Sequence, residues 1–180
     1  TGQWILIRLL RQFKVYQPIY ELSPSQHQEK GKTPSFGGIG ILLTIWMGIV
    51  SFQLLSLKWV WLMTYITLVA ILGCLDDYIS VNKQQNKGLS ARSKFILQYI
   101  IAAIFLTIYH IWILPLSIPV ILFYSLVMVG TMNATNLSDG LDGLLSGLAL
   151  ISLLGFTMLF SKLGNSEAMN VCFISMISVS

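Results

Sequence analysis

The chain alternates between long apolar runs and short polar segments. Four runs contain no Asp, Glu, Lys or Arg, and they cover residues 33–57, 59–75, 95–138 and 143–161. Because a helix needs about 20 mostly apolar residues to cross a bilayer, each run suits one span and the longest suits two. Pro115 and Pro119 favour a turn inside that longest run. The pattern predicts an all-α, polytopic bundle of transmembrane helices.

The runs predict six to seven spans in one integral-membrane domain, residues 1–180. Spans are expected at residues 36–57, 59–75, 95–114, 117–132 and 144–161, with a partial span at 1–13 and a seventh beginning near residue 168. Since successive helices reverse direction, the loops on one side of the membrane are 14–35, 76–94 and 133–143. The chain begins and ends in apolar runs, so we expect it to be truncated at both ends.

Composition excludes an ordinary soluble domain. Only 10% of the residues are charged and 55% are hydrophobic, whereas about 25% are charged in typical soluble domains. Cys74 and Cys172 have neither the spacing of a metal site nor the number of a disulfide framework, so we interpret both as small apolar fillers.

The basic residues indicate the orientation. Nine of the eleven lysines and arginines fall on the side of the three loops, namely Arg8, Arg11, Lys14, Lys30, Lys32, Lys83, Lys87, Arg92 and Lys94. An excess of Lys and Arg marks the cytoplasmic side of a membrane protein. All acidic residues except Glu167 lie on the same side. Such a surface suits a reaction between a water-soluble anionic substrate and a lipid headgroup.

Two pairs of aspartates stand at the ends of apolar runs, where a carboxylate is costly and therefore a functional candidate. The first pair, Asp76 and Asp77, follows the run 59–75. Adjacent residues on a helix point in different directions, so one carboxylate is expected to face substrate or metal and the other the protein. The alternative is a pair of solvated charges neutralised by Lys83 and Lys87.

The second pair, Asp139 and Asp142, follows two asparagines. Ser138 is expected to cap a helix that begins at Asp139, which would place both aspartates on one helix face. Asn133 and Asn136 supply amides that donate and accept, and such amides suit recognition of a nucleobase or ribose. The alternative, a capped helix in an ordinary loop, explains the serine but not the cluster of asparagines and aspartates.

A third polar segment precedes the first complete span. Lys30 and Lys32 are suited to hold phosphates as point charges, and Gly37-Gly38 allows a backbone to approach a ligand. A basic loop that only sets the topology, with His27 at its surface, is the alternative.

Together and in this order, the three segments resemble the polyprenyl-phosphate N-acetylhexosamine-1-phosphate transferases, the glycosyltransferase 4 family. The matching stretches are His27-x-x-Lys30-x-x-Thr33-Pro34-x-x-Gly37-Gly38, Asp76-Asp77-Tyr78 with Lys87-Gly-Leu-Ser-Ala-Arg92, and Asn133-x-x-Asn136-Leu-Ser-Asp139-Gly-Leu-Asp142-Gly-Leu144. Three motifs on three loops, separated by spans, make a specific match. It covers nearly the whole chain but about half of that family's usual architecture.

Within that family, the motifs are most similar to the branch acting on phospho-MurNAc-pentapeptide. The resemblance implies its transfer from UDP-MurNAc-pentapeptide to undecaprenyl phosphate, giving lipid I and UMP in peptidoglycan synthesis, with Mg²⁺ as cofactor. The implied partners are these two substrates and the lipid bilayer of the bacterial cytoplasmic membrane, not nucleic acid, and a homodimer stays open. The implied site residues are catalytic Asp76 and Asp77, substrate-binding Lys30, Asn136, Asp139 and Asp142, and metal-binding Asp76 and Asp142.

Asp76 is expected to act on the lipid phosphate, either as a base or as a nucleophile. The second pKa of a phosphate monoester is about 6, so the acceptor is already largely dianionic and a base would gain little. A covalent aspartyl intermediate is the competing scheme. Release of UMP without lipid acceptor would favour that intermediate.

Two departures from the family pattern bear on activity. Ser80 stands where the family usually has a lysine, and the nearest cation is Lys83. The family's third catalytic aspartate, its main magnesium ligand, and a histidine cluster belong to later loops. We therefore expect these 180 residues alone to be inactive.

Three other functions fit the sequence less well. A sister transferase that uses UDP-GlcNAc or a related UDP-sugar is disfavoured by the stretches Thr33–Gly38 and Lys87–Arg92, which look more like the muramoyl enzymes. A cation or proton transporter would need carboxylates near the bilayer midplane, whereas the four aspartates lie at one interface. A purely structural subunit would not require the Asn/Asp cluster.

Overall fold

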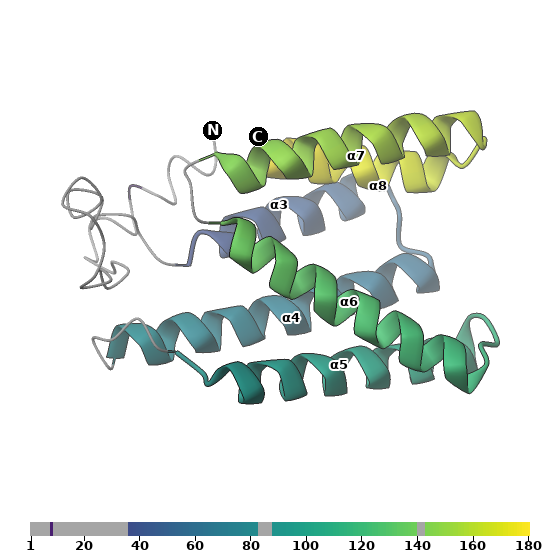
Figure 1. Cartoon of the computed structure of the whole chain (residues 1–180). Coiled ribbons are helices and arrows are strands. Elements are labelled where there is room, and N and C mark those ends of the chain that lie inside the picture. The colour runs from purple at the N-terminus through teal and green to yellow at the C-terminus, as the bar shows by residue number, and fades with distance from the viewer. Residues whose placement is uncertain (1–7, 9–35, 83–87, 140–142) are drawn as a thin grey trace.

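The computed structural model describes Arg8 and residues 36–82, 88–139 and 143–180. Apart from Arg8, the helices of these residues are α3 (Gly38–Ser51), α4 (Leu57–Asn82), α5 (Ala91–Trp112), α6 (Ile118–Ser138), α7 (Leu144–Lys162) and α8 (Ser166–Val179). Successive helices run in opposite directions (Figure 1). The end where α4 and α6 finish and where α5 and α7 begin is called the polar end below. The predicted all-α membrane bundle is confirmed.

Within the described residues, the number of spans is lower than the sequence predicts. The helices α4, α5, α6 and α7 are long and apolar enough to cross a membrane, while α3 has 14 residues, short of the roughly 20 that a span needs. The helix α8 begins at Ser166, near the expected start of the seventh span, and has 14 residues up to Val179. The described residues thus support four to six spans, not six to seven. The partial span at 1–13 lies outside the described residues except for Arg8.

The helix α3 ends earlier than its apolar run. Its last turn is closed by the Phe52 N–H, which donates to the carbonyl of Gly48 at 2.9 Å. Gln53 then takes a left-handed conformation with φ 55°, and this conformation is not compatible with a continuing α-helix. The chain therefore turns before α4 although residues 52–57 carry no charge.

Two helices extend further into the polar end than expected. Asp76 and Asp77 lie inside α4, not in a loop beginning at residue 76, because the stretch from Asp76 to Asn82 contains no Gly or Pro that would end the helix. Asn133 and Asn136 likewise lie inside α6. The hydroxyls of that stretch donate back to carbonyls of their own helix, as Thr135 does to Thr131 at 3.0 Å, so they do not break it.

The predicted turn in the longest apolar run is confirmed. The helix α5 ends at Trp112, and α6 begins at Ile118 with Pro119 in its first turn, where a proline costs no hydrogen bond. Nδ1 of His110 accepts from the Leu116 N–H at 2.7 Å. His110 thus stabilises the turn.

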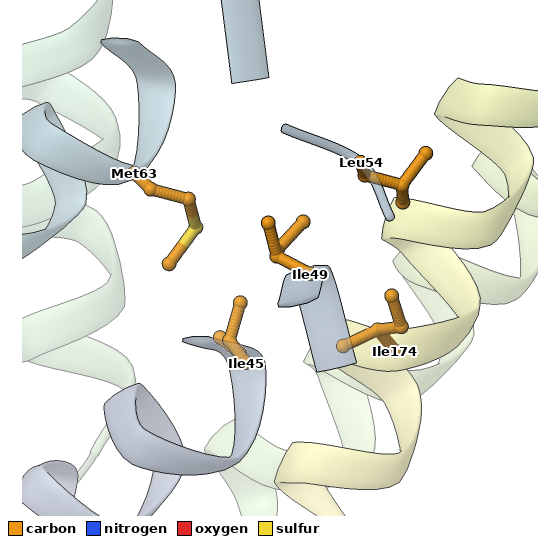
Figure 2. Packing of buried hydrophobic residues seen from close by; sticks show 5 residues of the cluster. All are labelled: Ile45, Ile49, Leu54, Met63 and Ile174. Atoms are coloured by element: carbon orange, nitrogen blue, oxygen red, sulfur yellow. The ribbon is translucent and has the colours of Figure 1, made fainter. Parts of the chain in front are cut away.

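Two clusters of buried apolar side chains hold the bundle together. The first joins α3, the segment after it, α4 and α8 (Figure 2), and contains Ile45, Ile49, Leu54, Met63 and Ile174. The second joins α4, α5 and α6, and contains Tyr65, Ala102, Phe105, Leu106 and Val129. The ring of Phe105 lies 4.7 Å from that of Tyr65 and 5.6 Å from that of Trp61. The second cluster therefore fixes α4, α5 and α6 relative to one another, and these helices carry Asp76, Asp77, Lys94 and Asn136.

Polar contacts join α4 and α8 at the opposite end of the bundle. The ammonium of Lys58 lies 2.5 Å from the carboxylate of Glu167, and the indole N–H of Trp59 donates to the same oxygen at 2.9 Å. Both charged side chains are about half exposed, and an exposed ion pair contributes little stability. These contacts lie at the end of α4 opposite to Asp76 and Asp77.

Gly48 allows α3 and α8 to pack closely, so replacing it should destabilise the bundle. A Cβ at this position would overlap Cγ2 of Ile174 and lie 3.2 Å from its Cβ. We expect Gly48→Ala to lower the free energy of unfolding by about 1–3 kcal/mol through overpacking, measured by thermal unfolding in detergent. Gly155→Ala, with nothing within 4 Å, is the matched control.

A second variant separates the clash from other effects of Gly48→Ala. Ile174→Ala removes both γ carbons that the new methyl group would meet. In that background Gly48→Ala should cost almost nothing. An undiminished cost would show that the close packing of the two helices is not its cause.

Candidate functional site

A cavity of about 390 Å³ opens between α4, α5 and α6 at the polar end. Its polar lining consists of Asp76, Asp77, Lys94, Gln98, Thr135, Asn136 and Asp139. Both aspartates of the first pair and Asp139 of the second therefore border one cavity, although they lie far apart in the sequence. Phe36 and Gly38 before and in α3, and Leu145 in α7, also border it.

The carboxylate of Asp76 accepts hydrogen bonds from two donors, one in α5 and one in the segment just before α5. Lys94 places its ammonium 2.6 Å from Oδ2, and the backbone N–H of Leu89 donates to Oδ1 at 2.8 Å. The side chain of Asp76 is 21% exposed and that of Lys94 is 24% exposed, so solvent screens the ion pair only partly. Asp76 thus ties the end of α4 to the beginning of α5.

Close backbone packing makes this contact possible. A Cβ on Gly88 would overlap Oδ1 of Asp76 and lie 2.7 Å from its carbonyl oxygen, so only glycine fits there. Two residues later Ser90 caps α5 by accepting from the Ser93 N–H at 3.1 Å, as serine commonly does at a helix start. Glycine, N–H donor and cap together fold the chain back over Asp76.

Asp77 has a weaker polar partner. The backbone N–H of Phe36 donates to its Oδ2 at 3.4 Å, near the upper limit for a hydrogen bond. Phe36 has a left-handed φ of 69°, which aims its N–H at α4. The two aspartates bond to different elements, as adjacent positions on a helix require, yet both border the cavity.

Asn133 links helices and does not line the cavity. It donates from Nδ2 to Oε1 of Gln98 at 2.7 Å and to the carbonyl of Val129 at 2.9 Å. Asn136, one turn further along α6, does line the cavity. Of the two asparagines expected to meet substrate, the structure brings one to the cavity.

The predicted cap at Ser138 is wrong. Ser138 is the last residue of α6 and donates to the carbonyl of Ala134 at 2.9 Å. Asp139 follows as the C-terminal cap of α6, and α7 begins at Leu144 after Gly143, whose φ is 80°. The helix that the serine pattern indicated therefore ends at Ser138 instead of beginning there, and Asp142 lies outside the described residues.

Several predicted site residues lie outside the described residues. They are His27, Lys30, Lys32, Lys83, Lys87 and Asp142. The substrate-binding assignment of Lys30 and the metal-binding assignment of Asp142 stay predictions.

Three polar residues of the cavity are not indicated as site residues by the sequence motifs, namely Lys94, Gln98 and Thr135. For Lys94 and Gln98 the sequence contains a signal, because they are four residues apart in an otherwise apolar stretch and therefore lie on one helix face.

The cavity's donors are oxygens of carboxylates and amides, which suit Mg²⁺. Within the three long described ranges, no three Asp, Glu, His or Cys side chains gather closely enough to hold an ion by themselves. Asp77 and Asp139 each keep a carboxylate oxygen that accepts no hydrogen bond from the described residues. The donor types thus fit Mg²⁺, while a full set of ligands would need further groups.

Known proteins match this chain over most of its length. A phospho-N-acetylmuramoyl-pentapeptide-transferase of Bacillus subtilis is 38% identical over 173 residues, or 86% of this chain and 53% of that protein. Proteins of the same name are 37% identical in Bacillus licheniformis, with the same coverage, and 31% identical in Staphylococcus carnosus, over 97% of this chain and 60% of that protein. The chain spans about half the length of the curated relatives it matches.

A family model matches the part of the chain that contains most residues of the cavity. The family model described as glycosyl transferase family 4 matches residues 59–180. That range contains both aspartates of α4, Lys94 and Gln98 of α5, and the Asn/Asp cluster after them. The chain belongs to glycosyl transferase family 4.

Proposed function

We propose that the full-length protein transfers phospho-MurNAc-pentapeptide from UDP-MurNAc-pentapeptide to undecaprenyl phosphate, giving lipid I and UMP. The observation that carries this proposal is the convergence of Asp76, Asp77, Asn136 and Asp139 on one cavity with Lys94. The names of the relatives quoted above support the choice of sugar. Phosphoryl transfer depends mainly on positioning and on charge stabilisation, and this cavity gathers groups for both.

We further propose that the cavity opens at the cytoplasmic face of a bacterial membrane. The helices make the chain a multi-pass membrane protein, and the excess of Lys and Arg on the side of the three loops that the sequence predicts supports this orientation. A water-soluble nucleotide and a lipid phosphate meet only at such an interface.

The contacts favour Asp77, more than Asp76, as the carboxylate nearest to substrate. Asp76 already accepts from Lys94 and Leu89, whereas Asp77 has one long hydrogen bond. In this proposal Asp76 positions Lys94 and the chain before α5, and Asp77 faces the reacting phosphate. The sequence alone suggested the opposite roles.

Mg²⁺ is proposed as the cofactor, with Asp77 and Asp139 as ligands from the described residues and Asp142 as a candidate outside them. When bound, the ion would neutralise charge on the phosphoryl group that is transferred. The chain's own residues hold the site in place, because Asp76 and Lys94 fix the beginning of α5 against the end of α4.

Reconstitution tests the proposed function. The full-length protein, purified in detergent, should form lipid I and UMP from UDP-MurNAc-pentapeptide and undecaprenyl phosphate, with loss of activity after chelation of Mg²⁺. UDP-GlcNAc, offered in competition, should not be consumed. Preferential consumption of UDP-GlcNAc would contradict the proposal and favour the sister transferase.

A further inference from the structure

The amide of Gln98 is held in one orientation by a chain of hydrogen bonds. One amide atom of the Asn133 side chain lies 2.9 Å from the carbonyl oxygen of Val129 and 2.7 Å from the side-chain amide of Gln98. A carbonyl oxygen only accepts, so that Asn133 atom must be its nitrogen. Its second hydrogen needs an acceptor, which must be Oε1 of Gln98. Nε2 of Gln98 is therefore the atom directed away from Asn133.

The two N–H groups of Gln98 Nε2 are nearly buried, and neither is used in a hydrogen bond to a described residue. The residue is 8% exposed and borders the cavity. Among the described residues no group accepts from Nε2, and no fully buried polar side-chain atom lacks a partner. Nε2 therefore reaches the cavity surface. A donor in such a place costs free energy unless something in the cavity accepts from it.

The neighbouring groups indicate what accepts. Lys94 lies one helical turn before Gln98 on the same face of α5, and its ammonium has three hydrogens, of which one is directed at Asp76. The acidic groups belong to α4 and α6. The wall formed by α5 is thus the side of the cavity that offers N–H donors to an anion with several oxygens.

We propose that Nε2 of Gln98 donates a hydrogen bond to an oxygen of a phosphate or diphosphate group held beside Lys94. Gln98 is then a substrate-contacting residue, and Asn133 positions it. This inference rests on the proposed function, in which the group is either the headgroup of undecaprenyl phosphate or the diphosphate of the UDP-sugar. The two sources share one chemistry, and the kinetics distinguish them.

Two substitutions of Gln98 separate binding from structure. Gln98→Glu keeps an oxygen for Asn133 but replaces the donor with a negative charge, whereas Gln98→Met loses both contacts at similar length. If Gln98 binds an anion, Gln98→Glu is the worse variant, with kcat/KM per folded protein about 10- to 100-fold below wild type. If Gln98 only joins α5 to α6, Gln98→Met is the worse variant. Gln53→Glu, on an exposed residue at the far end, is the control.

The measurements use the full-length protein in detergent. The KM that rises in Gln98→Glu, for undecaprenyl phosphate or for the UDP-sugar, identifies the source of the phosphate. Binding of inorganic diphosphate, measured by calorimetry, tests Gln98 without turnover. The proposed function is rejected if the wild-type protein makes no lipid I. The inference still stands in that case if diphosphate affinity falls from wild type to Gln98→Met to Gln98→Glu. Equal kcat/KM and equal binding in all three, or Gln98→Met as the worst, overturn it.

Discussion

Replacing Asp77 with asparagine is expected to remove most transferase activity and leave the fold unchanged. The asparagine oxygen can still accept from the Phe36 N–H, the polar contact of Asp77 at 3.4 Å, so little stability depends on the charge. The carboxylate borders the cavity, and losing a charged group at a phosphoryl-transfer site should lower kcat by about 10²- to 10³-fold. Lipid I synthesis and the thermal unfolding midpoint measure the two effects.

Asp76→Asn should behave differently because Asp76 holds Lys94. Removing its charge leaves a mostly buried ammonium without its partner at 2.6 Å, which should cost about 1–3 kcal/mol of stability in addition to activity. Glu167→Gln, the same change at an exposed ion pair, is the matched control and should alter neither stability nor activity.

An Asp77→Asn variant with wild-type activity would show that Asp77 does not face the substrate.

The sequence predicts the fold class well because hydrophobicity dominates this chain. Uncharged runs locate the helices, and the prolines near His110 locate a turn that the structure confirms. Helix ends are predicted poorly. The charge at Asp76 predicts the end of a helix there, but α4 continues to Asn82, because a helix that leaves a bilayer does not have to end at its surface.

The candidate site is predicted in part. The sequence motifs indicate Asp76, Asp77, Asn136 and Asp139, and all four border one cavity. The contact of Lys94 with Asp76 could not be predicted, because it depends on how Gly88 and Leu89 pack against the end of α4. The separate places of Asn133 and Asn136 depend on the rotation of α6, and no local pattern specifies that rotation. Local motifs identify reactive groups, whereas packing decides which of them share a cavity.

The chain before α5 is expected to tolerate no side chain at Gly88. In Gly88→Ala the new methyl group would overlap the carboxylate of Asp76 and approach its carbonyl oxygen at 2.7 Å. The backbone oxygen cannot turn aside as a flexible side chain does, so the segment must shift and the bond from Leu89 to Asp76 at 2.8 Å must lengthen or break. We expect a loss of about 1–3 kcal/mol of stability.

The same substitution should also lower activity, since Lys94 and Asp76 would lose their alignment at the cavity. Lipid I synthesis and thermal unfolding of the full-length protein measure both effects. Gly130→Ala in α6, with nothing within 4 Å, is the control and should be neutral or stabilise by up to about 1 kcal/mol through helix propensity. Full activity and unchanged stability in Gly88→Ala would mean that the packing of this segment on Asp76 does not position Lys94.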